Sequence, residues 1–174
     1  MIQTVEAIAL RTLAVEVVRA GSVLQREAGR LFRSFGVSAA QFNVLNLLAG
    51  SPKGLRASEI THSLVVDPSS TTYLLDQLEK RGWAARQPHP ADRRALRIVL
   101  TPAGKTLHAK LILVYHAALQ RMAQAFAPAD LTGALPFIEK LPTAAIEAVD
   151  QVTRRQAEQE RLRPRLKRKV KRKP

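Results

Sequence analysis

The amino-acid sequence predicts a mainly α-helical fold that contains one small β-hairpin. Apolar residues recur every three or four positions along most of the chain, helix-capping residues stand before these stretches, and the apolar period changes to two after Gly82. A length of 174 residues, 46% of them hydrophobic, allows one domain with a packed core. Because the chain has no cysteine, disulfide frameworks, cysteine zinc sites, catalytic thiols and thiol redox sensors are excluded.

A long amphipathic helix is predicted over residues 5–35. Its apolar residues lie three, four or seven positions apart and form one stripe, which consists of Leu10, Leu13, Val17, Leu24, Ala28, Leu31 and Phe35. Gly21 and Ser22 mark a candidate kink, and Gly36 is placed to end the helix. An ordinary globular helix has about 11 residues, so this length favours packing against a second chain over packing within the same chain.

Two short helices are predicted after Gly36. The first starts at the capping box that Ser38 forms with Gln41. The second covers residues 57–64, where Arg56 replaces the usual Ser or Thr cap and weakens the start of the helix by about 1 kcal/mol. Their predicted inward residues are Phe42, Leu45, Leu48, Ala49, Ile60 and Leu64.

A third helix is predicted to start with Asp67 as its N-cap and Pro68 as its first helical residue, and to end at Gly82. Its inward residues are Leu74, Leu75 and Leu78. A hairpin follows, with a short strand over residues 83–87 and a basic, proline-containing turn over residues 88–94. The second strand is predicted from the alternation of Leu96, Ile98 and Leu100 with more polar neighbours.

The C-terminal part is predicted to be helical. Thr101 and Pro102 start a helix that reaches about residue 127, with the inward stripe Leu107, Leu111, Val114, Ala118 and Met122. Pro128, Pro136 and Pro142 are predicted to divide the next region into short helices that each begin with a proline. A last helix is predicted from residue 143 to Arg163, with Pro164 as its stop.

Three helices followed by a hairpin with a charged tip is the element order of a winged helix-turn-helix, flanked here by long helices. The predicted parts are an N-terminal dimerisation helix over residues 1–37, a DNA-binding lobe over 38–101 and C-terminal dimerisation helices over 102–153. A basic extension follows over residues 154–174, and its end is predicted to be disordered.

The motifs of this region resemble those of the MarR (multiple antibiotic resistance regulator) family of bacterial transcription factors. They are DPSSTTYLLDQLEKRG over residues 67–82 and DRRALRIVLTPAG over residues 92–104, the second with the wing pattern D-x-R-x-x-x-x-x-L-T-x-x-G. The resemblance covers residues 38–104. It implies a winged-helix homodimer that binds DNA and responds to a small effector, often an aromatic or phenolic acid.

The start of the third predicted helix carries candidate DNA contacts. Five small or hydroxylated side chains stand at its N-terminal end, where free amides attract phosphate and hydroxyls reach phosphates or base edges. The predicted recognition-helix residues are Ser69, Ser70, Thr71, Thr72, Tyr73, Gln77, Lys80 and Arg81. The alternative is that Ser and Thr only cap the helix. Tyr73 and Gln77 depart from the family pattern, which often has Arg at both positions.

The wing provides the second set of candidate contacts. By the resemblance, Asp92 orients Arg94, whose side chain enters the minor groove; narrow A·T-rich grooves favour such an insertion. The predicted wing residues are Arg86, Asp92, Arg93, Arg94 and Arg97. The alternative for Asp92 and its neighbours is an exposed ion pair of small energetic value.

The net charge of +14 is unevenly distributed. Residues 154–174 hold 11 Lys and Arg against two Glu, so the rest of the chain has a net charge of only +5. The basic extension is predicted to run along phosphate and to strengthen non-specific binding through counterion release. The alternative is a solubilising extension without a partner.

Other site types have little support. The chain lacks the G-x-S-x-G, H-E-x-x-H, P-loop and G-x-G-x-x-G motifs, so no enzyme is predicted. His108 and His116 are eight residues apart, about 12 Å along a helix, and do not form a metal site; no cofactor is predicted. An anionic effector, such as an aromatic acid, could be bound by a basic side chain, but no pattern in the sequence singles one out. The candidates are Arg11, Arg19, Arg30 and His62.

The sequence therefore predicts a ligand-responsive homodimeric repressor that binds a pseudo-palindromic operator on double-stranded DNA. Without a signal peptide or an apolar run of about 18 residues, it is expected in the bacterial cytoplasm, at the nucleoid and not in a membrane. One alternative is a non-specific or architectural nucleic-acid-binding protein dominated by its basic tail. Another is a protein–protein adaptor that has lost operator binding.

Overall fold

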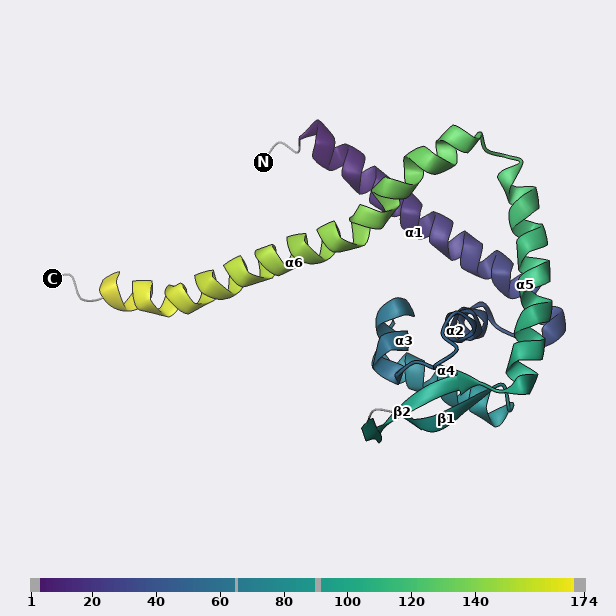
Figure 1. Cartoon of the computed structure of the whole chain (residues 1–174). Coiled ribbons are helices and arrows are strands. Elements are labelled where there is room, and N and C mark those ends of the chain that lie inside the picture. The colour runs from purple at the N-terminus through teal and green to yellow at the C-terminus, as the bar shows by residue number, and fades with distance from the viewer. Residues whose placement is uncertain (1–3, 65, 90–91, 171–174) are drawn as a thin grey trace. The chain divides into compact units, whose positions relative to one another are not determined.

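The computed structural model describes residues 4–64, 66–89 and 92–170, and describes side chains within these ranges except at 89, 92–94 and 159–170. It contains the helices α1 (Val5–Leu31), η1 (Arg33–Phe35, a 3-10 helix), α2 (Ala39–Ala49), α3 (Ala57–Leu64), α4 (Pro68–Lys80), α5 (Pro102–Ala123) and α6 (Pro128–Val170), and the strands β1 (Ala84–His89) and β2 (Asp92–Leu100). The predicted fold class, mainly α with one hairpin, is confirmed (Figure 1). The chain divides into two compact units, Met1–Gln120 and Arg121–Pro174.

The core of the first unit is built around α2. This helix contributes four buried apolar side chains, Phe42, Val44, Leu45 and Leu48. They pack with buried residues of the neighbouring elements, namely Phe32, Val37, Ile60, Leu75, Leu78, Ala84, Ile98 and Leu111. The predicted inward residues Ala49, Leu64 and Leu74 are only half-buried. The core thus joins the helix-turn-helix, the base of the hairpin and α5 into one lobe.

The helix starts follow local capping chemistry. At α2, the Gln41 amide N–H donates to the Ser38 hydroxyl at 3.1 Å and the Ser38 amide donates to Gln41 Oε1 at 2.9 Å, which confirms the capping box. At α3, the Arg56 amide donates to the Glu59 carboxylate at 2.6 Å, a cap that offsets part of the predicted weakness. Asp67 is the N-cap residue of α4, but its side chain makes no capping hydrogen bond.

Helix α1 ends earlier than predicted. It stops at Leu31, and η1 leads to Gly36, whose φ of 66° ends the helical segment as expected. The helix runs without interruption through Gly21 and Ser22. None of its residues is buried; only its C-terminal end, with Ala28 and Leu31, packs against the core.

The hairpin is longer than predicted. The strands pair antiparallel from Ala84 opposite Leu100 to Pro88 opposite Leu96, and a register shift follows before His89 pairs with Asp92. Pro88 is tolerated because it lies two residues after Arg86, whose amide N–H points away from β2 to Glu79, so the missing N–H of Pro88 leaves no ladder bond unmade. Of the predicted inward residues, Ile98 is buried and Leu100 half-buried, whereas Leu96 is exposed, since the hairpin extends beyond the core.

The second unit contradicts the prediction that prolines divide it. Helix α6 runs continuously through Pro136, Pro142 and Pro164 up to Val170. An interior proline removes its own N–H bond and crowds the carbonyl four residues before it, at a cost of about 3 kcal/mol, but its fixed φ near −65° is itself helical, so a helix can continue past it. The backbone of the basic extension is therefore helical over residues 154–170, and residues 171–174 lie outside the described part of the chain.

His108 on α5 contacts α2, and its environment is expected to make the stability of the fold depend on pH. Its Nε2 lies 3.1 Å from Asn46 Oδ1, its ring stacks on Phe42, and burial lowers its pKa below the ordinary 6.5. The native state therefore binds this proton less readily than the unfolded state does, so stability is highest above pH 6.5 and falls as the pH decreases below it.

The expected result is that His108→Gln flattens this dependence. Thermal unfolding at about pH 7.5 and about pH 5.5 measures it, and the drop in midpoint should be smaller for the variant than for the wild type. An equal drop in both proteins would contradict the role of His108.

Candidate nucleic-acid interface

Helix α4 presents one face to the core and the opposite face outward. Its inward side is formed by Thr71, Leu75 and Leu78, which are all buried. Ser69 and Tyr73 are four residues apart and lie on the outward side. Tyr73 is 64% exposed on this face, so its side chain is accessible to a partner.

Thr71 is corrected from a DNA contact to a core residue. It is 1% exposed, and its hydroxyl lies 2.9 Å from that of Thr61 on α3, within hydrogen-bond distance. The reason is its register: Thr71 precedes Leu75 by four residues and Leu78 by seven, which places all three on the inward face.

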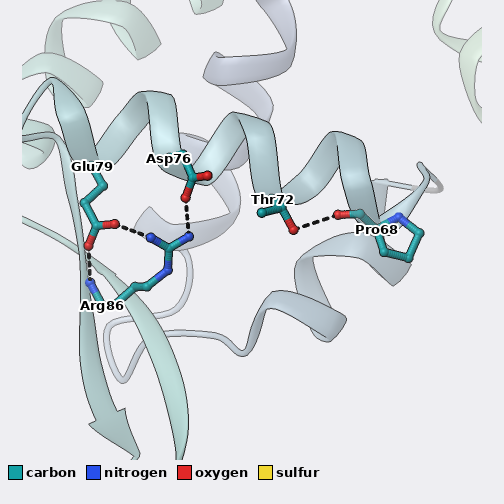
Figure 2. Close-up of polar contacts among 5 residues, drawn as sticks. All are labelled: Pro68, Thr72, Asp76, Glu79 and Arg86. Carbon is teal, nitrogen blue, oxygen red and sulfur yellow. Dashed lines mark hydrogen bonds and ion pairs between the residues drawn. The ribbon is translucent and has the colours of Figure 1, made fainter.

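The other hydroxylated residues of α4 are exposed. Ser69, Ser70 and Thr72 face solvent, and the Thr72 hydroxyl donates to the Pro68 carbonyl at 3.0 Å, as Figure 2 shows. The Asp67 side chain makes no capping hydrogen bond. It therefore does not compete with a phosphate for the first amides of α4.

A hollow lies along one flank of α4. It has a volume of about 430 Å³ and is lined by Ala40, Val66, Ser69, Ser70, Tyr73 and Leu74. Three of the predicted recognition residues thus border one mostly apolar depression next to the start of α2.

Arg81 and Arg97 each donate a hydrogen bond to a backbone carbonyl of the protein. Arg81 donates to the Gly36 carbonyl at 2.5 Å and lies over the Trp83 ring at 4.9 Å, which fastens the end of α4 to the turn after α1. Arg97 donates to the Lys53 carbonyl at 2.7 Å. Both side chains thus make contacts within the protein, and the prediction that they contact DNA stays a prediction.

Arg86 is likewise engaged within the protein. Its guanidinium binds the carboxylates of Asp76, at 2.6 Å, and Glu79, and its amide N–H donates to Glu79 Oε1 at 3.2 Å (Figure 2). Its hydrogen bond to Asp76 contributes most to holding the pKa of Arg86 above its ordinary value. Asp76 and Glu79 are not among the residues that the sequence predicts for this site, because they meet Arg86 only after the chain has turned at Gly82.

The remaining predicted residues lie on α4 and at the start of β2. Lys80 is exposed at the end of α4 and Gln77 is half-buried. Asp92, Arg93 and Arg94 form the start of β2, and their side chains lie outside the described residues, so their predicted roles stay untested.

Metal and effector sites find little support in the geometry. Among the described residues, no group of three or more His, Asp or Glu side chains is placed to hold a metal ion. Arg30 pairs with Glu27 at 2.8 Å and Arg19 lies 3.7 Å from Glu16, all on α1. Within the ranges that the structure covers, no helix is long and apolar enough to cross a membrane.

Comparison with known proteins identifies the region around this interface. The MarR family model matches residues 35–95. The chain is 34% identical over 91 residues to the HTH-type transcriptional regulator PecS of Dickeya dadantii, a stretch that covers 51% of this chain and 55% of PecS. The chain spans about half the length of the curated relatives it matches. PecS is named as a regulator of transcription, in line with the prediction that the chain is not an enzyme.

Solved structures share the fold. CouR from Rhodococcus jostii RHA1, bound to p-coumaroyl-CoA, has a TM-score of 0.69 at 22% identity, over 74% of this chain and 90% of CouR. The MarR family protein Rv2887 of Mycobacterium tuberculosis, in complex with p-aminosalicylic acid, has a TM-score of 0.59 at 27% identity, over 75% of this chain and 98% of Rv2887. The winged-helix region of this chain is thus similar to MarR family regulators, in line with the resemblance of its motifs.

Proposed function

We propose that this chain is a sequence-specific DNA-binding transcriptional regulator that acts as a homodimeric repressor on a pseudo-palindromic operator. The observation that carries the proposal is the exposed outward face of α4, with Tyr73 at its centre, beside a hairpin whose tip bears basic residues. In a winged helix-turn-helix, this helix enters the major groove and the hairpin reaches the neighbouring backbone or minor groove.

The proposed base-reading residues are those of α4 that remain accessible. They are Ser69, Ser70, Thr72, Tyr73 and Gln77, with Lys80 at the end of the helix as a phosphate contact. Arg93 and Arg94, at the start of β2, are proposed to contact the backbone and the minor groove. Helix α4 contains no arginine, the commonest reader of guanine, so the proposed readout uses hydroxyl and apolar contacts.

A homodimer is proposed from the apolar residues of α1. Leu10, Leu13 and Leu24 belong to one stripe and are 53%, 41% and 53% exposed. Apolar side chains also remain exposed along α6, namely Leu131, Leu135, Phe137, Ile138, Ile146, Val149 and Val152. Long helices with exposed apolar stripes are stabilised by a partner, and two-fold pairing would bring two recognition helices to half-sites about 34 Å apart.

A small aromatic effector is proposed to control binding. CouR is bound to p-coumaroyl-CoA and Rv2887 to p-aminosalicylic acid in their structures, and both ligands carry an aromatic ring and acidic groups. Binding of such a ligand would favour a spacing of the recognition helices that does not match the operator, and the promoter would be released. Titration of the protein–operator complex with aromatic acids tests this proposal, and an operator affinity unchanged by all of them would contradict it.

An architectural DNA-binding protein is the second candidate. The observation in its favour is the basic extension, which holds 11 of the 28 Lys and Arg residues of the chain. Such a protein would bind duplexes without sequence preference, with a steep dependence on salt, and would lose binding when the extension is removed.

Replacement of Tyr73 by alanine tests the proposed reading face. The expected result is a loss of about 1–3 kcal/mol of binding free energy on the selected operator and little change on a random duplex, because the contact is made to bases. Fluorescence anisotropy with labelled duplexes measures both, and Tyr73→Phe serves as the conservative control. Equal losses on both duplexes would contradict a role of Tyr73 in sequence readout.

A further inference from the structure

We propose that Arg86 is a positioning residue of the DNA interface: it holds β1 against α4 and compensates the charges of Asp76 and Glu79. This inference rests on the proposed DNA-binding function and goes beyond it, because it identifies what keeps the recognition helix and the wing in one arrangement. It also replaces the expectation that Arg86 contacts phosphate.

The contacts of Arg86 join two elements of the interface. Its guanidinium donates to Asp76 Oδ1 at 2.6 Å and to Glu79 Oε2, and its own amide N–H donates to Glu79 Oε1 at 3.2 Å. Both carboxylates belong to α4 and Arg86 belongs to β1 (Figure 2). A rotation of the hairpin relative to α4 would therefore break several charge-assisted hydrogen bonds at once.

The same contacts partly neutralise the negative charges of two carboxylates on α4. Asp76 and Glu79 lie three residues apart on the side of the helix that faces the hairpin, and their side chains are 55% and 40% exposed. A helix that approaches DNA with two uncompensated carboxylates would be repelled by phosphate. Arg86 reduces the formal charge of this cluster from −2 to −1 and directs the carboxylates toward β1.

A direct phosphate contact by Arg86 would break its hydrogen bonds to Asp76 and Glu79. Both terminal nitrogens of the guanidinium are directed at carboxylates, and the side chain is only 31% exposed. To reach a phosphate, the side chain would have to leave both partners and expose their charges next to the DNA. The geometry thus assigns Arg86 an action through Asp76 and Glu79.

A rescue experiment on the full chain tests the assignment. Arg86→Gln is expected to weaken binding to the selected operator about tenfold, because it leaves two carboxylates unpaired. Adding Asp76→Asn and Glu79→Gln to this variant should restore the affinity to within about threefold of the wild type. Arg86→Lys, which retains the charge but not the planar fork, should lie between the wild type and Arg86→Gln. Circular dichroism verifies that each variant is folded.

Arg97→Gln is the matched control, because Arg97 lies on the same hairpin and donates to the Lys53 carbonyl instead of a carboxylate. The Asp76→Asn and Glu79→Gln changes should not rescue it. The salt dependence of binding gives the second readout: the rescued variant should keep the slope of the wild type.

Two results would overturn the assignment. One is a triple variant that binds as weakly as Arg86→Gln with a slope of log K against log salt that is lower by about 1, which indicates a lost phosphate contact. The other is an Arg86→Gln variant with wild-type affinity. If the wild type binds no duplex at all, the proposed function itself fails, and this outcome is distinct from a failed rescue on a protein that binds.

Discussion

Gly104→Ala is expected to destabilise the first unit by about 3 kcal/mol, at the upper end of the cost of overpacking. Gly104 lies in the first turn of α5, where its amide N–H donates to the Thr101 hydroxyl at 3.0 Å. A Cβ at this position would lie 1.9 Å from the carbonyl oxygen of Trp83 and 2.8 Å from its carbonyl carbon. Both are backbone atoms, so no side-chain rotation can relieve the contact.

The Trp83 carbonyl has little freedom to move away. It accepts the Thr101 amide N–H at 3.1 Å, and the Trp83 amide donates to the Leu78 carbonyl at 2.9 Å. The turn between α4 and β1 is thus fixed from both sides, and α5 can pack on it only where a side chain is absent. Gly104 therefore lets α5 pack against the turn between α4 and β1 at a distance that alanine does not allow.

Urea unfolding followed by the fluorescence of Trp83, the single tryptophan of the chain, measures the effect directly. Gly21→Ala is the control, because a Cβ at Gly21 meets nothing within 4 Å, and alanine should stabilise this exposed helical position by about 1 kcal/mol. A midpoint for Gly104→Ala equal to that of the wild type would contradict the packing described at Trp83.

Introduction of charge into the apolar stripe of α1 is expected to dissociate the proposed homodimer. The double variant Leu13→Glu and Leu24→Glu would place two carboxylates in the proposed interface, while both side chains are already exposed within a single chain and the fold should persist. A monomer engages one half-site, so the affinity for a two-half-site operator should fall by about 10²–10⁴-fold.

Sedimentation at micromolar concentration and operator binding measure the two consequences separately. Ser22→Glu, at an exposed polar position of the same helix, is the matched control and should leave the dimer intact. A double variant that remains a dimer would exclude this stripe as the interface. A wild-type protein that sediments as a monomer would contradict the two-half-site arrangement itself.

The parts of the fold set by local chemistry were predictable from the sequence. The capping box of Ser38 and Gln41, the positive φ of Gly82 after α4 and the Thr101 cap of α5 all depend on residues within a few positions of one another. Thr71 was predictable as well: its spacing from Leu75 and Leu78 already placed it on the inward face, although its hydroxyl suggested the surface.

Other features depend on contacts between distant residues, or on the net cost of a residue within a long helix, and no local sequence pattern reveals these. The partners of Arg86 lie on α4 and meet it only after the chain has turned at Gly82, so a count of surface charges could not identify them. In α6, each proline predicted a break by itself. The helix nevertheless continues through Pro136 and Pro142, since the φ of proline is itself helical and each proline disturbs only the turn before it.

The proposed function requires that the winged-helix lobe, and not the basic extension, selects the DNA sequence. Selection of bound duplexes from a random pool tests it most directly, with the full chain and with a chain that ends at Arg155 compared in parallel. Both chains are expected to enrich the same pseudo-palindrome, and the shortened chain should bind with weaker overall affinity and a smaller salt dependence. Absence of any motif, together with loss of binding on truncation, would contradict it in favour of the architectural function.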